Sequence, residues 1–321
     1  MNHAADNSNP AASDRERFAQ KLRGILLPIT TPFTPAEEID IQGLKANIRT
    51  WNSSAIAGYV VLGSTGERVN LDGREYQEVI ETARAEIPGD LAFVVGAGQQ
   101  SRRGTINEIR CAAAAGADGV LVITPHYYRA AITQPALVDH YRAVADESPV
   151  PVLIYSMPDL TGIKVDPQTA AQLSTHPNII GIKDSSADVP GLRETIRLST
   201  KDFTVLTGNG TVLYEALDAG ARGGILAVAC VATFCCTEIF RLMNGGRNDE
   251  ALALQSKLTP LALAVTKRYG IGGLKAALDM LSLAGGSVRL PLESPNAAAR
   301  DEIAGLLRVV HGASSTATVV T

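Results

Sequence analysis

The feature that most constrains the fold of this chain is a set of eight short apolar runs, rich in β-branched residues and spread over most of its length. Apolar runs of this length indicate strands that are buried on both faces. The segments between most of them carry Ala, Leu, Glu and Arg at helical spacing, so strands and helices alternate. Eight such repeats predict a closed parallel (β/α)8 barrel, the TIM barrel. The runs are GILLPITTPF from Gly24, GYVVLGS from Gly58, LAFVVGAG from Leu91, GVLVITP from Gly119, PVLIYSM from Pro151, IIGIKDS from Ile179, TVLTGNG from Thr204 and GGILAVA from Gly223.

An open, doubly wound sheet is the alternative architecture for alternating strands and helices. Its G-x-G-x-x-G turn after the first strand is absent, because Gly24 is followed by LLPITTPF. With 321 residues, 45% of them hydrophobic, the chain suffices for one barrel and an appendage. We therefore expect a barrel over residues 21–232 and C-terminal helices that complete and extend it over 233–310. Residues 1–20 and 311–321 are expected to be flexible ends.

Charge, hydropathy and cysteine content disfavour several classes of function. The net charge is −4 and acidic and basic residues are mixed, so no basic surface for nucleic acid or an anionic membrane is expected. No stretch reaches the roughly 18 apolar residues of a membrane helix, and the N-terminus has no apolar signal segment. The four cysteines form no CxxC pair and the five histidines are scattered, which disfavours a metal site and predicts reduced thiols. We expect a soluble cytoplasmic protein with a small-molecule partner.

Polar side chains gather where four of the predicted strands end. In a (β/α)8 barrel the functional groups lie at the carboxyl ends of the strands and in the loops that follow them. The second run ends in GSTGE at residues 63–67, and the fourth ends in TPHYYR at residues 124–129. The fifth ends in YSMPDLTG at residues 155–162, and the sixth ends in GIKDSS at residues 181–186. These four segments are the candidates for an active site.

Lys183 lies at the end of an apolar strand. Strand alternation predicts that it shares a face with Ile179 and Gly181, and if that face is the barrel interior, its amine is confined and partly dry. Burial disfavours the charged ammonium, and the neutral amine is the form that attacks a ketone. Lys183 is therefore a candidate Schiff-base nucleophile. The alternative is a lysine that extends to solvent between strand and loop.

Tyr155 and the GSTGE turn supply groups that could assist such a nucleophile. Tyr155 ends the strand before that of Lys183, and a phenol there can shuttle the protons of a carbinolamine, although it could equally pack on a loop. The turn offers backbone N–H groups and the hydroxyls of Ser64 and Thr65, which suit a carboxylate or a proton relay. Glu67 could brace the loop or act in the chemistry.

Together, GSTGE, TPHYYR, YSMPDLTG and GIKDSS, in this order and spacing, resemble the dihydrodipicolinate synthase / N-acetylneuraminate lyase family of pyruvate-dependent class I aldolases. The resemblance runs from about Gly24 to about Leu307. Within that family the chain most resembles the 4-hydroxy-2-oxoglutarate aldolases. The segments that carry this similarity are TPHYYRAAITQPALVDHYRAVADESPVPVLIYSMP, STHPNIIGIKDSSADV and AVTKRYGIGGLK.

The resemblance implies a role for each matching residue. Lys183 would form the imine, Tyr155 would be the acid and base at the imine carbon and the aldol hydroxyl, and Ser64 and Thr65 would hold the pyruvate carboxylate. Ser64 would also belong to the proton relay. The resemblance further implies a homotetramer and no metal or organic cofactor, because the iminium itself is the electron sink.

Other implied residues come from neighbouring strands. Tyr128, the second tyrosine of HYYR, would complete the proton relay from a neighbouring subunit, although Tyr127 remains open because TPHYYR is one residue longer than the commoner TPYYN. Gly208 and Ile225 would line the pocket at the ends of the last two strands. Ser185 falls where the hydroxyoxoglutarate aldolases carry a serine near the substrate.

Two departures from the family pattern bear on the substrate. Dihydrodipicolinate synthases carry an arginine where this chain has Leu160, and N-acetylneuraminate lyases carry acidic residues where it has Asn209, Gly210 and Thr211. The resemblance therefore predicts cleavage of a 4-hydroxy-2-oxo acid to pyruvate and an aldehyde. The alternatives are a dihydrodipicolinate synthase, a Schiff-base dehydratase or hydratase-aldolase of the same family, and a non-catalytic barrel that binds an oxo acid.

Overall fold

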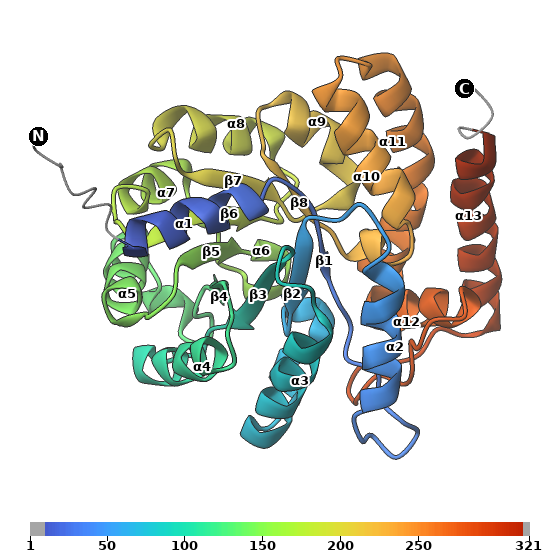
Figure 1. Cartoon of the computed structure of the whole chain (residues 1–321), viewed down its shortest axis with the longest axis horizontal. Helices are drawn as coiled ribbons and strands as arrows, with labels where there is room; N and C mark the ends of the chain where they lie inside the picture. The colour runs from blue at the N-terminus through green and yellow to red at the C-terminus, as the bar shows by residue number, and fades with distance from the viewer. Residues whose placement is uncertain (1–9, 317–321) are drawn as a thin grey trace, which may run out of the picture.

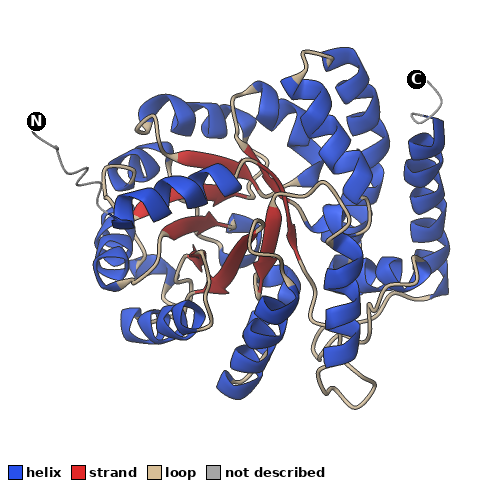
Figure 2. Cartoon of the chain, in the orientation of Figure 1, coloured by secondary structure: helices blue, strands red, loops and turns tan. Residues whose placement is uncertain are grey.

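The computed structural model describes the backbone of residues 10–316 and the side chains of residues 15–312, and it confirms the predicted barrel. Eight parallel strands close in sequence order, and the last pairs with the first through Leu26 and Ile225. Figure 2 shows the strands enclosed by helices. The strands are β1 (Gly24–Pro28), β2 (Gly58–Val61), β3 (Ala92–Ala97), β4 (Gly119–Ile123), β5 (Val152–Ser156), β6 (Ile179–Asp184), β7 (Thr204–Thr207) and β8 (Gly223–Ile225).

Helices cover the outside of the barrel and continue beyond it. In Figure 1, α13 stands at the edge of the molecule, beyond α10 and α11. The helices are α1 (Pro10–Lys21), α2 (Ile41–Trp51), α3 (Gly73–Glu86), α4 (Arg102–Ala114), α5 (Gln134–Glu147), α6 (Pro158–Thr161), α7 (Pro167–Leu173), α8 (Val189–Leu198), α9 (Leu213–Asp218), α10 (Thr233–Asn244), α11 (Asn248–Leu263), α12 (Gly270–Met280) and α13 (Ala297–Thr316).

The apolar strand residues supply two separate cores, because successive side chains of a strand point to opposite faces. One core lies between the strands and the surrounding helices and includes Ile25, Val61 and Ile182. The other fills the barrel interior and includes Leu26 and Val60. This double burial explains why the strands have apolar residues at successive positions rather than at alternate ones.

A bulge in β6 changes which residues share a face with Lys183. Val152 of β5 pairs with Ile179, but the next residue, Leu153, pairs with Gly181, so Ile180 is an extra residue. Ile179 packs in the outer core and Ile180 in the barrel interior. The prediction that Ile179 shares the face of Lys183 is therefore wrong, because strict alternation fails at the bulge.

The N-terminal segment forms a helix where a flexible end was expected. Residues 10–20 belong to α1, which lies across one end of the barrel (Figure 1). Phe18 and Leu22 are buried in the barrel interior, and the Phe18 ring packs over the backbone of Gly119 at the start of β4. The sequence analysis did not identify this helix, because the polar composition of the segment concealed the apolar pair. Residues 1–9 lie outside the described part of the chain.

The C-terminal helices meet the barrel near the β2 turn. The helix α13 runs to Thr316, into the segment expected to be a flexible tail, and residues 317–321 lie outside the described ones. The helix α12 packs against α13 and carries the buried Lys275. Across residues 10–316, no helix is both long enough and apolar enough to cross a membrane.

Candidate active site

Lys183 and Tyr155 face each other inside the barrel. They are directly paired across β5 and β6, and each side chain is only 4% exposed. The Lys183 Nζ lies 4.2 Å from the centroid of the Tyr155 ring. Among the described residues, no hydrogen bond or ion pair engages this amine. The expected position of Tyr155 beside Lys183 is therefore confirmed, and the amine lies without a polar partner in a confined space.

Ser64 reaches the phenol of Tyr155 from the turn after β2. Its Oγ lies 3.4 Å from the Tyr155 Oη, which is long for a hydrogen bond between two hydroxyls but leaves no room for another group between them. Ser64 begins a short 3₁₀ turn (Ser64–Gly66), and Thr65 in the same turn is buried. A proton on the Tyr155 oxygen therefore has a neighbouring hydroxyl with which to exchange.

The turn that carries Ser64 and Thr65 is strained. Leu62, two residues before Ser64, has φ 59°, and Glu67, which ends the turn, has φ 54°. Left-handed backbone at non-glycine residues costs about 1–3 kcal/mol each and persists where the surroundings enforce it. Both side chains are buried, so the protein fixes this turn through contacts that a glycine could not make.

Ser185 and Gly208 lie against Lys183. A Cβ added to Gly208 would lie 1.9 Å from the Ser185 Oγ and 2.7 Å from the Lys183 Cε, so only glycine leaves room for both side chains. The Ser185 hydroxyl is buried and has no hydrogen-bond partner among the described residues. A buried hydroxyl without a partner costs free energy, and a bound polar ligand could supply the partner. Ile225 is fully buried in the barrel interior.

Three other predicted residues are exposed in the single chain. Tyr127 and Tyr128 are 74% and 72% exposed, and their rings contact each other edge to face, 5.0 Å between centroids. Leu160, in α6, is 59% exposed. No contact joins any of these side chains to Lys183 in the described structure.

The sequence analysis left the role of Glu67 open, and the structure places it in a buried ion pair. Its Oε1 lies 2.5 Å from the Nζ of Lys275, and both side chains are almost completely buried. The Lys275 Nζ also donates to the Ser287 carbonyl at 2.6 Å and lies 4.3 Å from the Phe33 ring centroid. Glu67 therefore braces the turn. The signal for Lys275 was a lone lysine in an apolar helical segment, GIGGLKAALDML.

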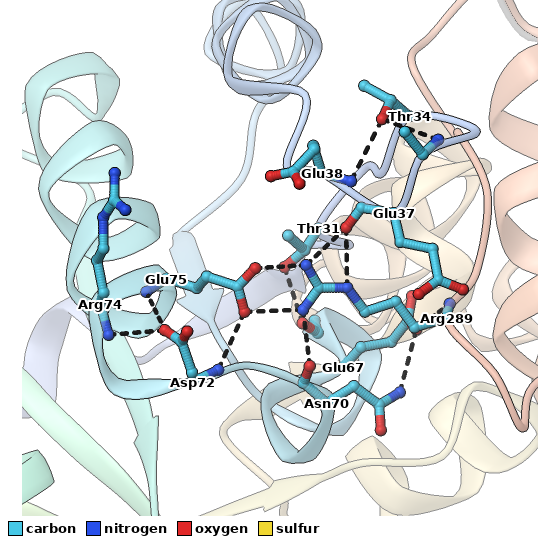
Figure 3. A network of polar contacts seen from close by, with 12 residues as sticks. Thr31, Thr34, Glu37, Glu38, Glu67, Asn70, Asp72, Arg74, Glu75 and Arg289 are labelled. Carbon is cyan, nitrogen blue, oxygen red and sulfur yellow. Dashed lines mark hydrogen bonds and ion pairs between the residues drawn. The ribbon is translucent and has the colours of Figure 1, made fainter.

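A wider polar network surrounds Glu67 (Figure 3). Its Oε2 accepts from the Arg289 backbone N–H at 3.2 Å and from the Asn70 side-chain amide at 3.3 Å. The Arg289 guanidinium forms an ion pair with Glu75 and donates to the Glu37 and Asn70 carbonyls. Glu75 also closes the capping box at the start of α3 with Asp72. The network thus joins the β2 turn to the start of α3 and to the C-terminal segment.

Burial and ion pairing shift several pKa values around this network. Burial lowers the pKa of Lys275, although the Glu67 carboxylate acts in the opposite sense. The Arg289 guanidinium holds the pKa of the Glu75 carboxyl below its usual value. Burial raises the pKa of Asp184, the neighbour of Lys183 in β6. The lowered pKa of Lys275 does not make it the better nucleophile, because Glu67 and Ser287 already engage its amine.

A small cavity opens beside Ser64 and Tyr155, and its wall also includes Arg68, Leu121 and Ile123. Larger cavities lie at the opposite end of the barrel, around Arg23, away from these residues. Within the described part of the chain, no group of three or more His, Cys, Asp and Glu side chains could hold a metal ion.

Comparison with known proteins identifies similar sequences and structures. The dihydrodipicolinate synthetase family matches residues 21–309. A 4-hydroxy-tetrahydrodipicolinate synthase of Methanosphaerula palustris is 34% identical over 277 residues, which cover 85% of this chain and 94% of that protein. A probable mitochondrial 4-hydroxy-2-oxoglutarate aldolase of Emericella nidulans is 33% identical over 278 residues, which cover 85% and 90%. The crystal structure of dihydrodipicolinate synthase from Thermotoga maritima is 28% identical with a TM-score of 0.85, covering 90% of this chain and 98% of that one.

Proposed function

Because this chain belongs to the dihydrodipicolinate synthetase family of class I, pyruvate-dependent carbon–carbon lyases, we propose that it cleaves a 4-hydroxy-2-oxo acid to pyruvate and an aldehyde. The observation that carries this proposal is the pairing of Lys183 with Tyr155 inside the barrel, with Ser64 beside the phenol. An amine without a hydrogen-bond or ion-pair partner among the described residues, next to a phenol that can carry protons, is the arrangement that imine chemistry requires.

The reaction begins when the Lys183 Nζ attacks C2 of the oxo acid. The carbinolamine loses water through proton transfers with Tyr155 and becomes an iminium. The C3–C4 bond then breaks as the 4-hydroxyl loses its proton towards Tyr155 and Ser64, and the bonding electrons pass into the iminium. The aldehyde leaves, and the enamine that remains is protonated at C3. Hydrolysis of the resulting imine releases pyruvate and restores the amine.

The surrounding residues are assigned to binding. Ser64 and Thr65 hold the carboxylate next to C2, and Ser185 supplies its unpartnered hydroxyl to the substrate. Gly208 and Ile225 shape the wall of the pocket. Hydrogen bonds to a charged carboxylate are stronger than neutral ones, so the turn would bind the pyruvate half more strongly than an uncharged analogue.

A shared relay completes the proposed site. We propose that the protein assembles as a homotetramer and that Tyr128, or its neighbour Tyr127, enters the site of an adjacent subunit. The exposure of both rings in the single chain supports this proposal, since contact with an adjacent subunit would bury these two apolar side chains. It also explains why neither ring reaches Tyr155 within one chain.

The relatives named 4-hydroxy-tetrahydrodipicolinate synthase favour a second candidate, condensation of pyruvate with aspartate semialdehyde. Leu160 argues against it, because leucine offers no donor where those enzymes place an arginine for the second carboxylate. A bidentate contact of that kind contributes about 2–3 kcal/mol, or roughly 30- to 150-fold in specificity.

Two measurements test the proposal. Pyruvate plus borohydride should reduce an imine on Lys183 alone, which peptide mass mapping will locate. An unmodified Lys183, or equal labelling of Lys164, Lys201 or Lys275, would exclude the mechanism.

A screen of 2-oxo acids, with pyruvate release coupled to lactate dehydrogenase, should then identify the substrate. In the synthetic direction, Leu160→Arg should shift the preferred aldehyde from a compact one such as glyoxylate towards aspartate semialdehyde. An unchanged ratio would show that Leu160 does not line the pocket.

A further inference from the structure

The strained turn after β2 depends on contacts from a distant part of the chain. Its carboxyl end, Glu67, adopts a left-handed backbone conformation that glycine accommodates more easily. A glutamate at such a position implies that its side chain has a task. That side chain is wholly buried and points to Lys275 of α12, a residue that belongs to none of the barrel strands.

The position of Lys275 is fixed from several sides. The Glu67 carboxylate, the Ser287 carbonyl and the Phe33 ring all contact its ammonium, and its residue is 1% exposed. Breaking a buried ion pair by removing one partner leaves the other charge unpaired, so the two residues are strongly coupled. The pair therefore fixes the end of the turn relative to α12.

Other hydrogen bonds also hold the turn, including those that the second Glu67 carboxylate oxygen accepts from the Arg289 N–H and the Asn70 amide. The Gly66 carbonyl accepts from the Thr31 hydroxyl at 2.8 Å, and the Glu67 N–H donates to the Ser64 carbonyl at 3.2 Å. Glu67 is thus bonded to the Ser64 carbonyl through its N–H, while its carboxylate meets Lys275, which is the only charged side chain among its partners in the described residues. A shift of the Glu67 side chain would move the Ser64 hydroxyl relative to Tyr155.

We infer that the buried Glu67–Lys275 pair is a positioning element of the site, which sets Ser64 and Thr65 at the distance needed to bind the carboxylate of the oxo acid. This inference rests on the proposed function, because it assumes that the turn receives a carboxylate. Neither residue touches the substrate, and neither exchanges a proton with it.

The test compares pyruvate with methyl pyruvate, which keeps the ketone and lacks the anionic carboxylate. The measured quantity is the concentration that gives half-maximal borohydride trapping at Lys183. In Lys275→Met this concentration should rise about 10- to 100-fold for pyruvate and stay within about twofold for the ester. A purely structural defect would raise the half-maximal trapping concentration of both compounds alike.

Two further variants keep the test decisive. Lys275→Met leaves the buried Glu67 carboxylate unpaired, and circular dichroism will show whether this variant folds. If it does not fold, the double variant Glu67→Gln/Lys275→Met replaces it, because neither residue of the pair is then charged. Lys21→Met is the matched control, because it removes an ion pair with Asp118 at the far end of the barrel. This control should lower the melting temperature without altering either trapping concentration.

The possible failures are distinguishable. A parent protein without any adduct at Lys183 overturns the proposed function and this inference with it. If the parent forms the adduct, two results in a folded variant would overturn the inference alone. One is an unchanged half-maximal trapping concentration for pyruvate. The other is an equal rise of this concentration for pyruvate and methyl pyruvate.

Discussion

At the scale of single residues, the site depends on a few side chains that strand pairing brings together. Lys183 and Tyr155 lie far apart in sequence but occupy directly paired positions on neighbouring strands. Their proximity was predictable because strands of a (β/α)8 barrel pair in sequence order. The contact of Glu67 with Lys275 was not predictable, since it depends on how α12 packs against the barrel.

The phenol of Tyr155 should be required for turnover and not for folding. In Tyr155→Phe the ring and its packing remain, while the hydroxyl that meets Ser64 is lost. Loss of a general acid and base typically lowers the rate by about 10²–10⁴. We expect kcat to fall by that factor and the melting temperature to change little. A variant within threefold of the parent would assign the proton transfers to another group.

Activity should require glycine at position 208, because a side chain there would displace the groups around Lys183. Gly208→Ala would place a methyl group 1.9 Å from the Ser185 Oγ and 2.7 Å from the Lys183 Cε, so the lysine must move. A misplacement of about 1 Å can cost about 10²-fold, and we expect kcat/KM to fall by this order. Gly73→Ala is the control, because a Cβ there meets no atom within 4 Å. Equal activity in the two variants would place Gly208 outside the site.

At the scale of elements, the sequence predicted the strands better than the helix that precedes them. Every strand was predicted because burial on both faces leaves continuous apolar runs. The helix α1 was missed, since only Phe18 and Leu22 of this polar region enter the interior. The bulge at Ile180 left no signal either, because an isoleucine suits the inner and the outer face of a strand equally well.

The anchoring of α1 can be tested at Phe18, which is 3% exposed and packs within the barrel. Truncation of a buried phenylalanine costs about 3–5 kcal/mol. We expect Phe18→Ala to lower the free energy of unfolding by about this amount, measured by urea denaturation. Lys183 trapping should be retained in the folded fraction, because the site lies at the other end of the strands. A change below about 1 kcal/mol would show that α1 is not an integral part of the core.

At the scale of the whole molecule, the proposed relay makes each site the product of two chains. Mixed assemblies test this directly. A chain with Lys183→Met and a chain with both Tyr127→Phe and Tyr128→Phe should each be inactive alone. Refolded together, they should regain pyruvate release, because one kind of site then combines an intact lysine with intact tyrosines.

The outcome of this mixing experiment also reports on assembly. Recovered activity requires that the chains associate and that the tyrosines cross between them. An active double tyrosine variant would remove both rings from the relay. Inactive mixtures of chains that do associate would place the relay within a single chain.

The helix α1 lies at the end of the barrel opposite Lys183. Phe18 and Leu22 pack there against the apolar side chains that fill the barrel interior, so in the proposed reaction substrate, products and water would all reach Lys183 from the carboxyl ends of the strands. While the pyruvate half is bonded to the lysine, the aldehyde is the product that is free to depart. If the proposed reaction holds, an aldehyde that departs slowly would occupy the same approach as the water that hydrolyses the imine. It would then delay the release of pyruvate and favour the reverse condensation.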